Sequence, residues 1–116
     1  MIQATIYHNP RCSKSRETLA LLEQQGCDIS VVEYLKNPPT AKEIGDILSK
    51  LGLSARELMR TKETEYQALG LADTSLTEIQ LIEAMVNTPK LIERPIVLAN
   101  QRAVIGRPPE NVLAIL

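Results

Sequence analysis

The sequence predicts an α/β fold in which a β–α–β unit and a β–β–α unit are separated by a helical insertion. Two observations predict this order: short β-like stretches lie near both ends of the chain, and helix-capping motifs punctuate its middle. The 116 residues suffice for one hydrophobic core, so we expect a single domain over residues 1–116. The chain has no Phe or Trp, and this core should therefore be aliphatic.

The first unit is predicted as a strand over residues 2–7, a helix over 13–25 and a strand over 29–34. Leu19 and Leu22 share one face of the helix, and Gly26 stands where a left-handed residue closes a helix. The two strands of a β–α–β unit run parallel. We therefore expect a parallel strand pair with the helix packed on it.

The helical insertion is predicted at about residues 38–88. Two capping boxes, Thr40 with Glu43 and Ser54 with Glu57, each mark a helix start. Another helix should end before Pro89, since the residue before a proline disfavours helix. The predicted helices span residues 41–51, from 55 toward Arg60, and from Ser75 or Thr77 to about 87.

The last unit is predicted as strands over residues 96–99 and 103–105, followed by a short helix that ends at Leu116. The turn between the strands, Asn100-Gln101, is a weak hairpin signal because Asn-Gly would be preferred. Pro109 suits the first turn of the helix. The whole order is that of a thioredoxin-like fold with a helical insertion between its second and third strands.

Composition excludes several classes of function. Thirteen basic and 14 acidic residues give a net charge of -1, and only three aromatic residues are present, so a nucleic-acid partner is not expected. No apolar run approaches the roughly 18 residues of a membrane span. The N-terminus lacks the features of a signal peptide. We therefore expect a cytoplasmic protein, without a membrane partner, whose two thiols stay reduced.

Cys12 is the leading candidate for chemistry because it lies in the predicted strand-to-helix turn, at the mouth of the helix. Free backbone N–H groups and the helix dipole favour a negative charge there. Arg11, Lys14 and Arg16 add positive charge nearby. A thiolate in this position has a lowered pKa and is a nucleophile at neutral pH. The same N–H groups would bind a tetrahedral oxyanion.

The motif that begins at Cys12 is C-x-x-S, which cannot close a disulfide on itself and needs an external thiol to resolve an adduct. Burial as a small apolar residue is the alternative, but the charged neighbours disfavour it. That alternative suits Cys27, which has no cationic neighbour. His8 could either share in proton transfer or only shape the turn.

Arg60, Arg94 and Arg107 are candidate anion-binding residues. A lone surface arginine usually serves only solubility, but two of these three precede prolines at the ends of the predicted hairpin. In a thioredoxin-like fold, a cis proline before the third strand packs against the active-site turn, and Pro95 is the candidate. Arg94 would then face Cys12, where its planar fork could bind an oxyanion.

The chain resembles the glutaredoxin-dependent arsenate reductase family over nearly its whole length. The resemblance is carried by four motifs in order: Tyr7-His8-Asn9-Pro10 before Cys12, Tyr34-Leu35-x-Asn37-Pro38-Pro39, Leu69-Gly70-Leu71-Ala72 and Arg94-Pro95-Ile96-Val97. It implies an enzyme that reduces arsenate to arsenite with glutathione as co-substrate and glutaredoxin as partner. No bound cofactor or metal is implied.

The resemblance also implies a role for each site residue. Cys12 would attack arsenate and His8 would tune its thiolate. The oxyanion would be bound by Arg60, Arg94 and Arg107, whose guanidinium groups should converge on the Cys12 sulfur, and by Ser15. Two alternatives stay open: a glutathione-linked monothiol-disulfide oxidoreductase, and a Spx-type transcriptional regulator that binds RNA polymerase. A C-x-x-S motif argues against the disulfide switch of many such regulators.

Overall fold

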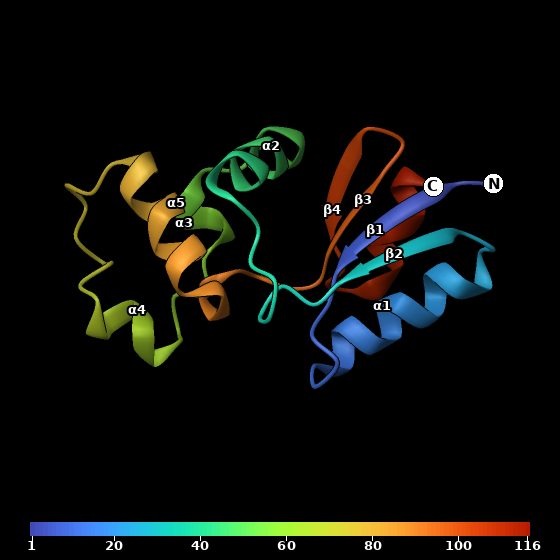
Figure 1. Cartoon of the computed structure of the whole chain (residues 1–116), viewed down its shortest axis with the longest axis horizontal. Helices are drawn as coiled ribbons and strands as arrows, with labels where there is room; N and C mark the ends of the chain where they lie inside the picture. Colours follow the sequence, from blue (N-terminus) through green and yellow to red (C-terminus); the bar gives the residue numbers. More distant parts are fainter. The chain divides into compact units, whose positions relative to one another are not determined.

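The computed structural model describes all residues, 1–116, and divides them into two compact units (Figure 1). The sheet unit consists of Met1–Asn37 and Arg94–Leu116 and contains all four strands. The helical unit, Pro38–Glu93, corresponds to the predicted insertion and extends it to Glu93. None of the helices has both the length and the apolar composition that a bilayer crossing requires.

The sheet has the thioredoxin-like topology that the sequence predicts. Its strands are β1 (Gln3–Tyr7), β2 (Asp28–Val32), β3 (Ile96–Ala99) and β4 (Arg102–Ile105), in the spatial order β2-β1-β3-β4. β1 and β2 are parallel, as a β–α–β connection requires, while β3 is antiparallel to both β1 and β4. The carboxyl end of β1 therefore lies beside the amino end of β3, where Tyr7 is paired with Ile96.

Two helices pack side by side in the sheet unit, α1 (Ser13–Gln24) and the 3-10 helix η2 (Pro109–Ile115) (Figure 1). Their apolar residues meet those of one sheet face in an aliphatic cluster. Cys27 packs against its edge and is partly buried. The buried residues of the cluster are Ala4, Ile6, Leu22, Val97, Ala99, Val112 and Ile115. The expectation of a wholly aliphatic core is corrected, because all three tyrosines, Tyr7, Tyr34 and Tyr66, are also buried.

The hairpin between β3 and β4 forms although its turn lacks glycine. Asn100 and Gln101 both have positive φ angles, 52° and 62°. Two successive residues of this kind match the twist of antiparallel strands. The side-chain amide of Asn100 also donates to the backbone oxygen of Ile115 at 2.8 Å, which ties the turn to η2.

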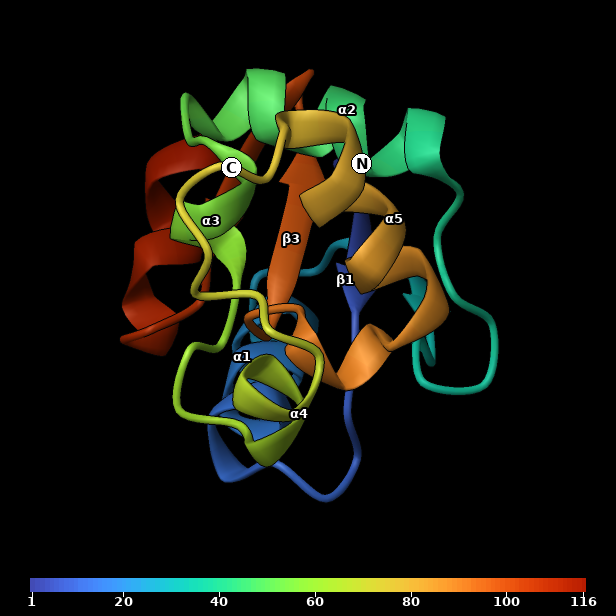
Figure 2. The ribbon, with the colours of Figure 1, turned by 90° about the vertical axis from the view of Figure 1, so that its left-hand side faces the viewer.

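The helical unit contains α2 (Ala41–Leu51), α3 (Ala55–Leu58), α4 (Thr64–Ala68), α5 (Glu78–Asn87) and the 3-10 helix η1 (Pro89–Leu91). α5 packs against α2, α3 and η1, and Figure 2 shows these elements together. Complete capping boxes begin α2, α3 and α5. By contrast, α4 was not predicted from the sequence, because its N-cap residue provides no side-chain hydrogen bond.

Candidate active site

Cys12 is the N-cap residue of α1, in the turn that follows β1, as the sequence predicts. Its backbone is extended, with φ -95° and ψ 123°, while its carbonyl already accepts the first helical bond from the Arg16 N–H at 3.0 Å. The side chain at such a position faces the free N–H groups of the first turn. The cysteine is partly exposed, so it is accessible to a small substrate.

Opposing influences set the pKa of the Cys12 thiol. Burial raises the pKa, but the backbone N–H groups of Ser15 and Lys14 and the side chain of Arg94 together lower it below its ordinary value. The amide contributions come from the helix N-terminus, where partial positive charge favours a thiolate. The structure therefore describes an activated cysteine.

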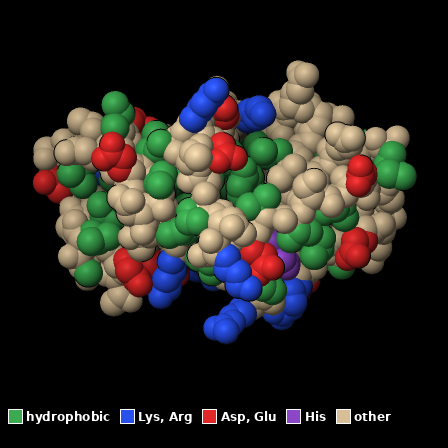
Figure 3. All heavy atoms as spheres, in the orientation of Figure 1, with side chains coloured by type: hydrophobic (Ala, Val, Ile, Leu, Met, Phe, Trp, Pro, Cys, Tyr) green, Lys and Arg blue, Asp and Glu red, His purple; other side chains and the backbone are tan.

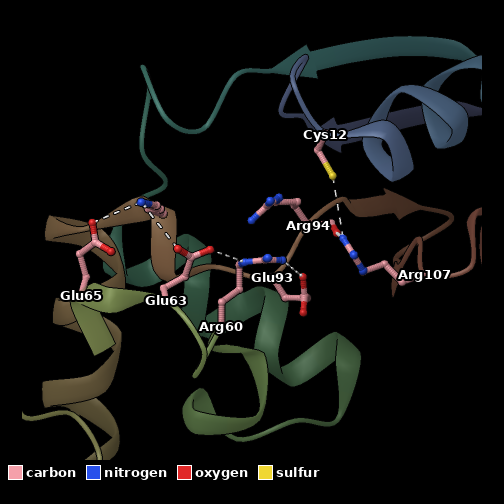
Figure 4. A network of polar contacts seen from close by, with 8 residues as sticks. Cys12, Arg60, Glu63, Glu65, Glu93, Arg94 and Arg107 are labelled. Atoms are coloured by element: carbon pink, nitrogen blue, oxygen red, sulfur yellow. Dashed lines mark hydrogen bonds and ion pairs between the residues drawn. The ribbon is translucent and has the colours of Figure 1, made fainter. Parts of the chain in front are cut away.

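Arg107 and Arg94 lie on the same side of the sheet unit as the Cys12 sulfur (Figure 4). Arg107 Nη1 is 3.9 Å from Cys12 Sγ and also donates to the backbone oxygen of Arg94 at 3.0 Å. Both arginines precede prolines, and both peptide bonds are cis. The cis bond before Pro95 was expected, whereas that before Pro108 was not. The side chains of both arginines thus lie beside the Cys12 thiol.

The backbone of Gly106 packs tightly against α1 and places Arg107 beside the sulfur. Its N–H donates to the Pro95 oxygen at 2.9 Å, and its carbonyl accepts from Thr18 Oγ1 at 3.3 Å. A Cβ at this position would lie 2.6 Å from Thr18 Oγ1 and 2.9 Å from Pro95 Cγ, closer than real Cβ contacts allow. Sequence reasoning did not single out Gly106 or Thr18, because their proximity exists only in the folded chain.

The Ser15 hydroxyl points away from Cys12 and contacts His8 and Asn9. The residue is 0% exposed, and its Oγ lies 2.6 Å from His8 Nδ1 and accepts the Asn9 N–H at 3.0 Å. The hydroxyl is thus held by His8 and Asn9, and the expected role of Ser15 in oxyanion binding stays a prediction. What Ser15 offers to Cys12 is its backbone N–H.

His8 is buried at the end of β1, and Ser15 fixes the orientation of its ring. Burial lowers the pKa of His8 below its ordinary value; the nearby Glu33 opposes this shift and Arg16 adds to it. The imidazole is therefore neutral at pH 7. Figure 3 shows Lys and Arg side chains gathered near this histidine.

Two of the three basic residues near Cys12 in the sequence contact other groups. Lys14 Nζ is 3.6 Å from Glu17 in an exposed ion pair, and Arg16 donates to the Pro10 carbonyl at 2.9 Å. Arg94 lies just before β3, far from Cys12 in the sequence, and is the arginine whose charge lowers the pKa of Cys12. The side-chain charge that lowers the pKa of this thiol therefore comes from a residue that tertiary structure brings to it.

Arg60 belongs to the helical unit, and its convergence with the other two arginines on Cys12 stays a prediction. Within its unit it is bound by two carboxylates: Nη1 donates to Glu93 at 2.7 Å and Nε to Glu63 at 3.1 Å (Figure 4). Burial lowers the pKa of this guanidinium, but the two carboxylates outweigh burial and raise it. Neither carboxylate was anticipated from the sequence.

The sequence pattern of the ArsC family matches residues 7–115, which include every site residue described above. The chain belongs to the ArsC family. A curated relative, the uncharacterized protein YfgD of Escherichia coli K12, is 61% identical over 98% of this chain and 97% of its own length. Another, the arsenate reductase of Neisseria meningitidis, is 51% identical over the full length of both chains.

Solved structures agree with the fold of this ArsC-family protein. The arsenate reductase from Vibrio cholerae is 52% identical and superimposes with a TM-score of 0.96, covering 99% of this chain and 98% of its own. At this similarity, the arrangement of strands and helices within each unit is that of the family.

Proposed function

We propose that this ArsC-family protein reduces arsenate to arsenite, with glutathione and glutaredoxin as electron donors. The observation that carries the proposal is the pairing of an activated Cys12 with an oxyanion site: its thiol pKa is lowered, and its sulfur lies 3.9 Å from Arg107. The relatives from Neisseria meningitidis and Vibrio cholerae, both named arsenate reductases, support the choice of substrate.

In the proposed first step, the Cys12 thiolate attacks the arsenic atom of arsenate. A sulfur–arsenic bond forms, and one oxygen leaves as water after taking up protons. Arg94, Arg107 and the first-turn N–H groups of α1 offset the negative charge of the remaining oxygens. We further propose that Arg60 completes this oxyanion site.

The electrons for the proposed reaction come from external thiols. The active-site turn has no second thiol that could resolve an adduct on Cys12, because Ser15 stands at the last position of the C-x-x-S motif. The other cysteine, Cys27, is partly buried against the core.

A glutathione thiol attacks the arsenic atom on Cys12, forming a second sulfur–arsenic bond as water leaves. A glutaredoxin thiol then attacks the glutathione sulfur: a mixed disulfide forms, the bond between that sulfur and arsenic breaks, and its electron pair reduces As(V) to As(III). Water then releases arsenite from Cys12. Arsenate and two thiols thereby yield arsenite, one disulfide and water. Such a reaction needs reduced glutathione, in keeping with the expected cytoplasmic location.

The test is an arsenate reduction assay with glutathione and glutaredoxin, comparing the wild type with Cys12→Ser. Arsenite formation by the wild type alone is expected. If the wild type forms no arsenite but reduces a glutathione mixed disulfide through Cys12, the monothiol-disulfide oxidoreductase alternative replaces the proposal. The disulfide assay should therefore be run on the same preparations.

A further inference from the structure

The backbone of the helical unit brings Arg60 and Glu93 together. Met59 and Ile92 form an isolated antiparallel bridge. On either side of it, the Arg60 N–H donates to the Leu91 oxygen at 2.7 Å and the Glu93 N–H donates to the Leu58 oxygen at 2.9 Å. Arg60 and Glu93 are consequently diagonal neighbours across a short two-stranded pairing, within side-chain reach of each other.

A turn brings the second carboxylate to the same guanidinium. The Glu63 N–H donates to the Arg60 oxygen at 3.2 Å, and this returns the Glu63 side chain to Arg60 Nε. All three side chains are substantially buried, with exposed fractions of 22% for Arg60, 19% for Glu63 and 28% for Glu93. Ion pairs with this degree of burial are screened less than surface pairs.

We propose that Glu63 and Glu93 determine the oxyanion affinity of the enzyme by occupying Arg60 as internal anions. This proposal rests on the proposed role of Arg60 in oxyanion binding. In the substrate-free protein, the two carboxylates hold the guanidinium and offset its charge. An incoming oxyanion must displace one of these carboxylates or share the guanidinium with it, and oxyanion binding is correspondingly weaker.

Hydrogen-bond geometry supports competition of this kind. An arginine binds an oxyanion bidentately through two adjacent nitrogens of its fork. Nε already donates to Glu63 and Nη1 to Glu93, whereas Nη2 donates to neither carboxylate. A bidentate contact with an oxyanion therefore includes Nε or Nη1. Nε has a single N–H, which Glu63 already accepts, whereas Nη1 has a second N–H beside the one that Glu93 accepts. The oxyanion must either displace Glu63 or share Nη1 with Glu93.

The charge around Arg60 supports the same conclusion. Lys90 also contacts this group of side chains: its Nζ lies 3.6 Å from Glu63 and 3.5 Å from Glu65. Glu63 and Glu93 contact Arg60, whereas Glu65 pairs with Lys90. The two carboxylates that contact Arg60 offset its charge, so an additional anion gains less from Arg60 than it would from an unpaired guanidinium.

The experiment measures anion binding without turnover. Sulfate should protect the Cys12 thiol from iodoacetamide, an uncharged reagent that does not itself compete for the arginines. In Glu93→Gln, which keeps an amide oxygen as acceptor but removes the charge, we expect half-protection at a sulfate concentration roughly threefold to tenfold lower than in the wild type. Glu63→Gln should shift it in the same direction. Structural damage would instead weaken protection.

Two further variants isolate the role of Arg60. Glu65→Gln removes an equal charge from the same network, but Glu65 pairs with Lys90 and not with Arg60, so sulfate protection should stay within about twofold of the wild type. Adding Arg60→Ala to Glu93→Gln should abolish the gain. Three results would overturn the proposal. In the first, sulfate protects Glu93→Gln no better than the wild type; in the second, it protects Glu65→Gln as well as Glu93→Gln. In the third, the gain in protection of Glu93→Gln persists when Arg60→Ala is added.

Arsenate reduction is assayed separately on every variant, so the two proposals can fail independently. Sulfate protection with the expected shifts but no arsenite formation contradicts the proposed function and supports the carboxylate competition. Arsenite formation with no effect of Arg60→Ala on sulfate protection supports the proposed function and overturns the competition.

Discussion

At the scale of single residues, the reactivity of Cys12 depends on hydrogen bonds that outweigh the cost of burial. We predict that the alkylation rate of Cys12, followed against pH, has a midpoint below the ~8.5 of an ordinary cysteine. Unfolding in urea should return the midpoint to that value, since the helix N-terminus and Arg94 no longer face the sulfur. A midpoint at or above ~8.5 in the folded protein would contradict the activated thiolate.

Loss of Arg94 should affect both the pKa of the Cys12 thiol and the binding of the substrate. Arg94→Ala removes a charge-assisted contact worth about 1.5–3 kcal/mol, and we expect a roughly tenfold to hundredfold rise in KM for arsenate. Arg94→Lys should recover only part of this loss, because an ammonium group lacks the bidentate fork. Arg102→Ala is the control, since Arg102 donates to Ala114 on η2. Full recovery by lysine would exclude a bidentate contact.

The lowered pKa of His8 predicts how stability depends on pH. Burial disfavours the imidazolium in the folded protein, so the unfolded chain binds a proton that the native state does not. The free energy of unfolding should therefore fall as the pH drops from about 7.5 through 6.5 toward the lowered pKa. Urea titrations at several pH values measure this slope. In His8→Asn the slope over this range should be shallower; an unchanged slope would assign it to other groups.

At the scale of elements, the contact between α1 and the end of β4 sets the position of Arg107. Gly106→Ala would place a methyl group against the fully buried Thr18, and we expect a loss of about 1–3 kcal/mol of stability together with weaker oxyanion binding. Gly45→Ala in α2 is the matched control: no atom lies within 4 Å of its Cβ position, so stability should rise by about 0.5–1 kcal/mol. Chemical denaturation of both variants checks the contrast.

The order of elements could be predicted from the sequence because its signals are local. Capping boxes and the proline-rich segment marked the helical insertion, and the position of Cys12 followed from the strand-to-helix turn. The carboxylates on Arg60 could not be predicted, since Glu93 is brought there by a bridge between distant segments. The inward turn of the Ser15 hydroxyl likewise depends on tertiary packing around His8.

At the scale of the whole molecule, the chain has two thiols with different surroundings, and the proposed chemistry uses only one. Cys27 packs against the aliphatic core, whereas Cys12 lies at the helix N-terminus beside Arg107. Cys27→Ser should therefore retain most of the wild-type arsenate reduction, and Cys12→Ser should have none. Adducts trapped with glutathione and located by mass spectrometry should map to Cys12 alone. If Cys27→Ser stays folded, as circular dichroism can establish, but loses turnover, then an internal disulfide takes part and the external-thiol mechanism is wrong.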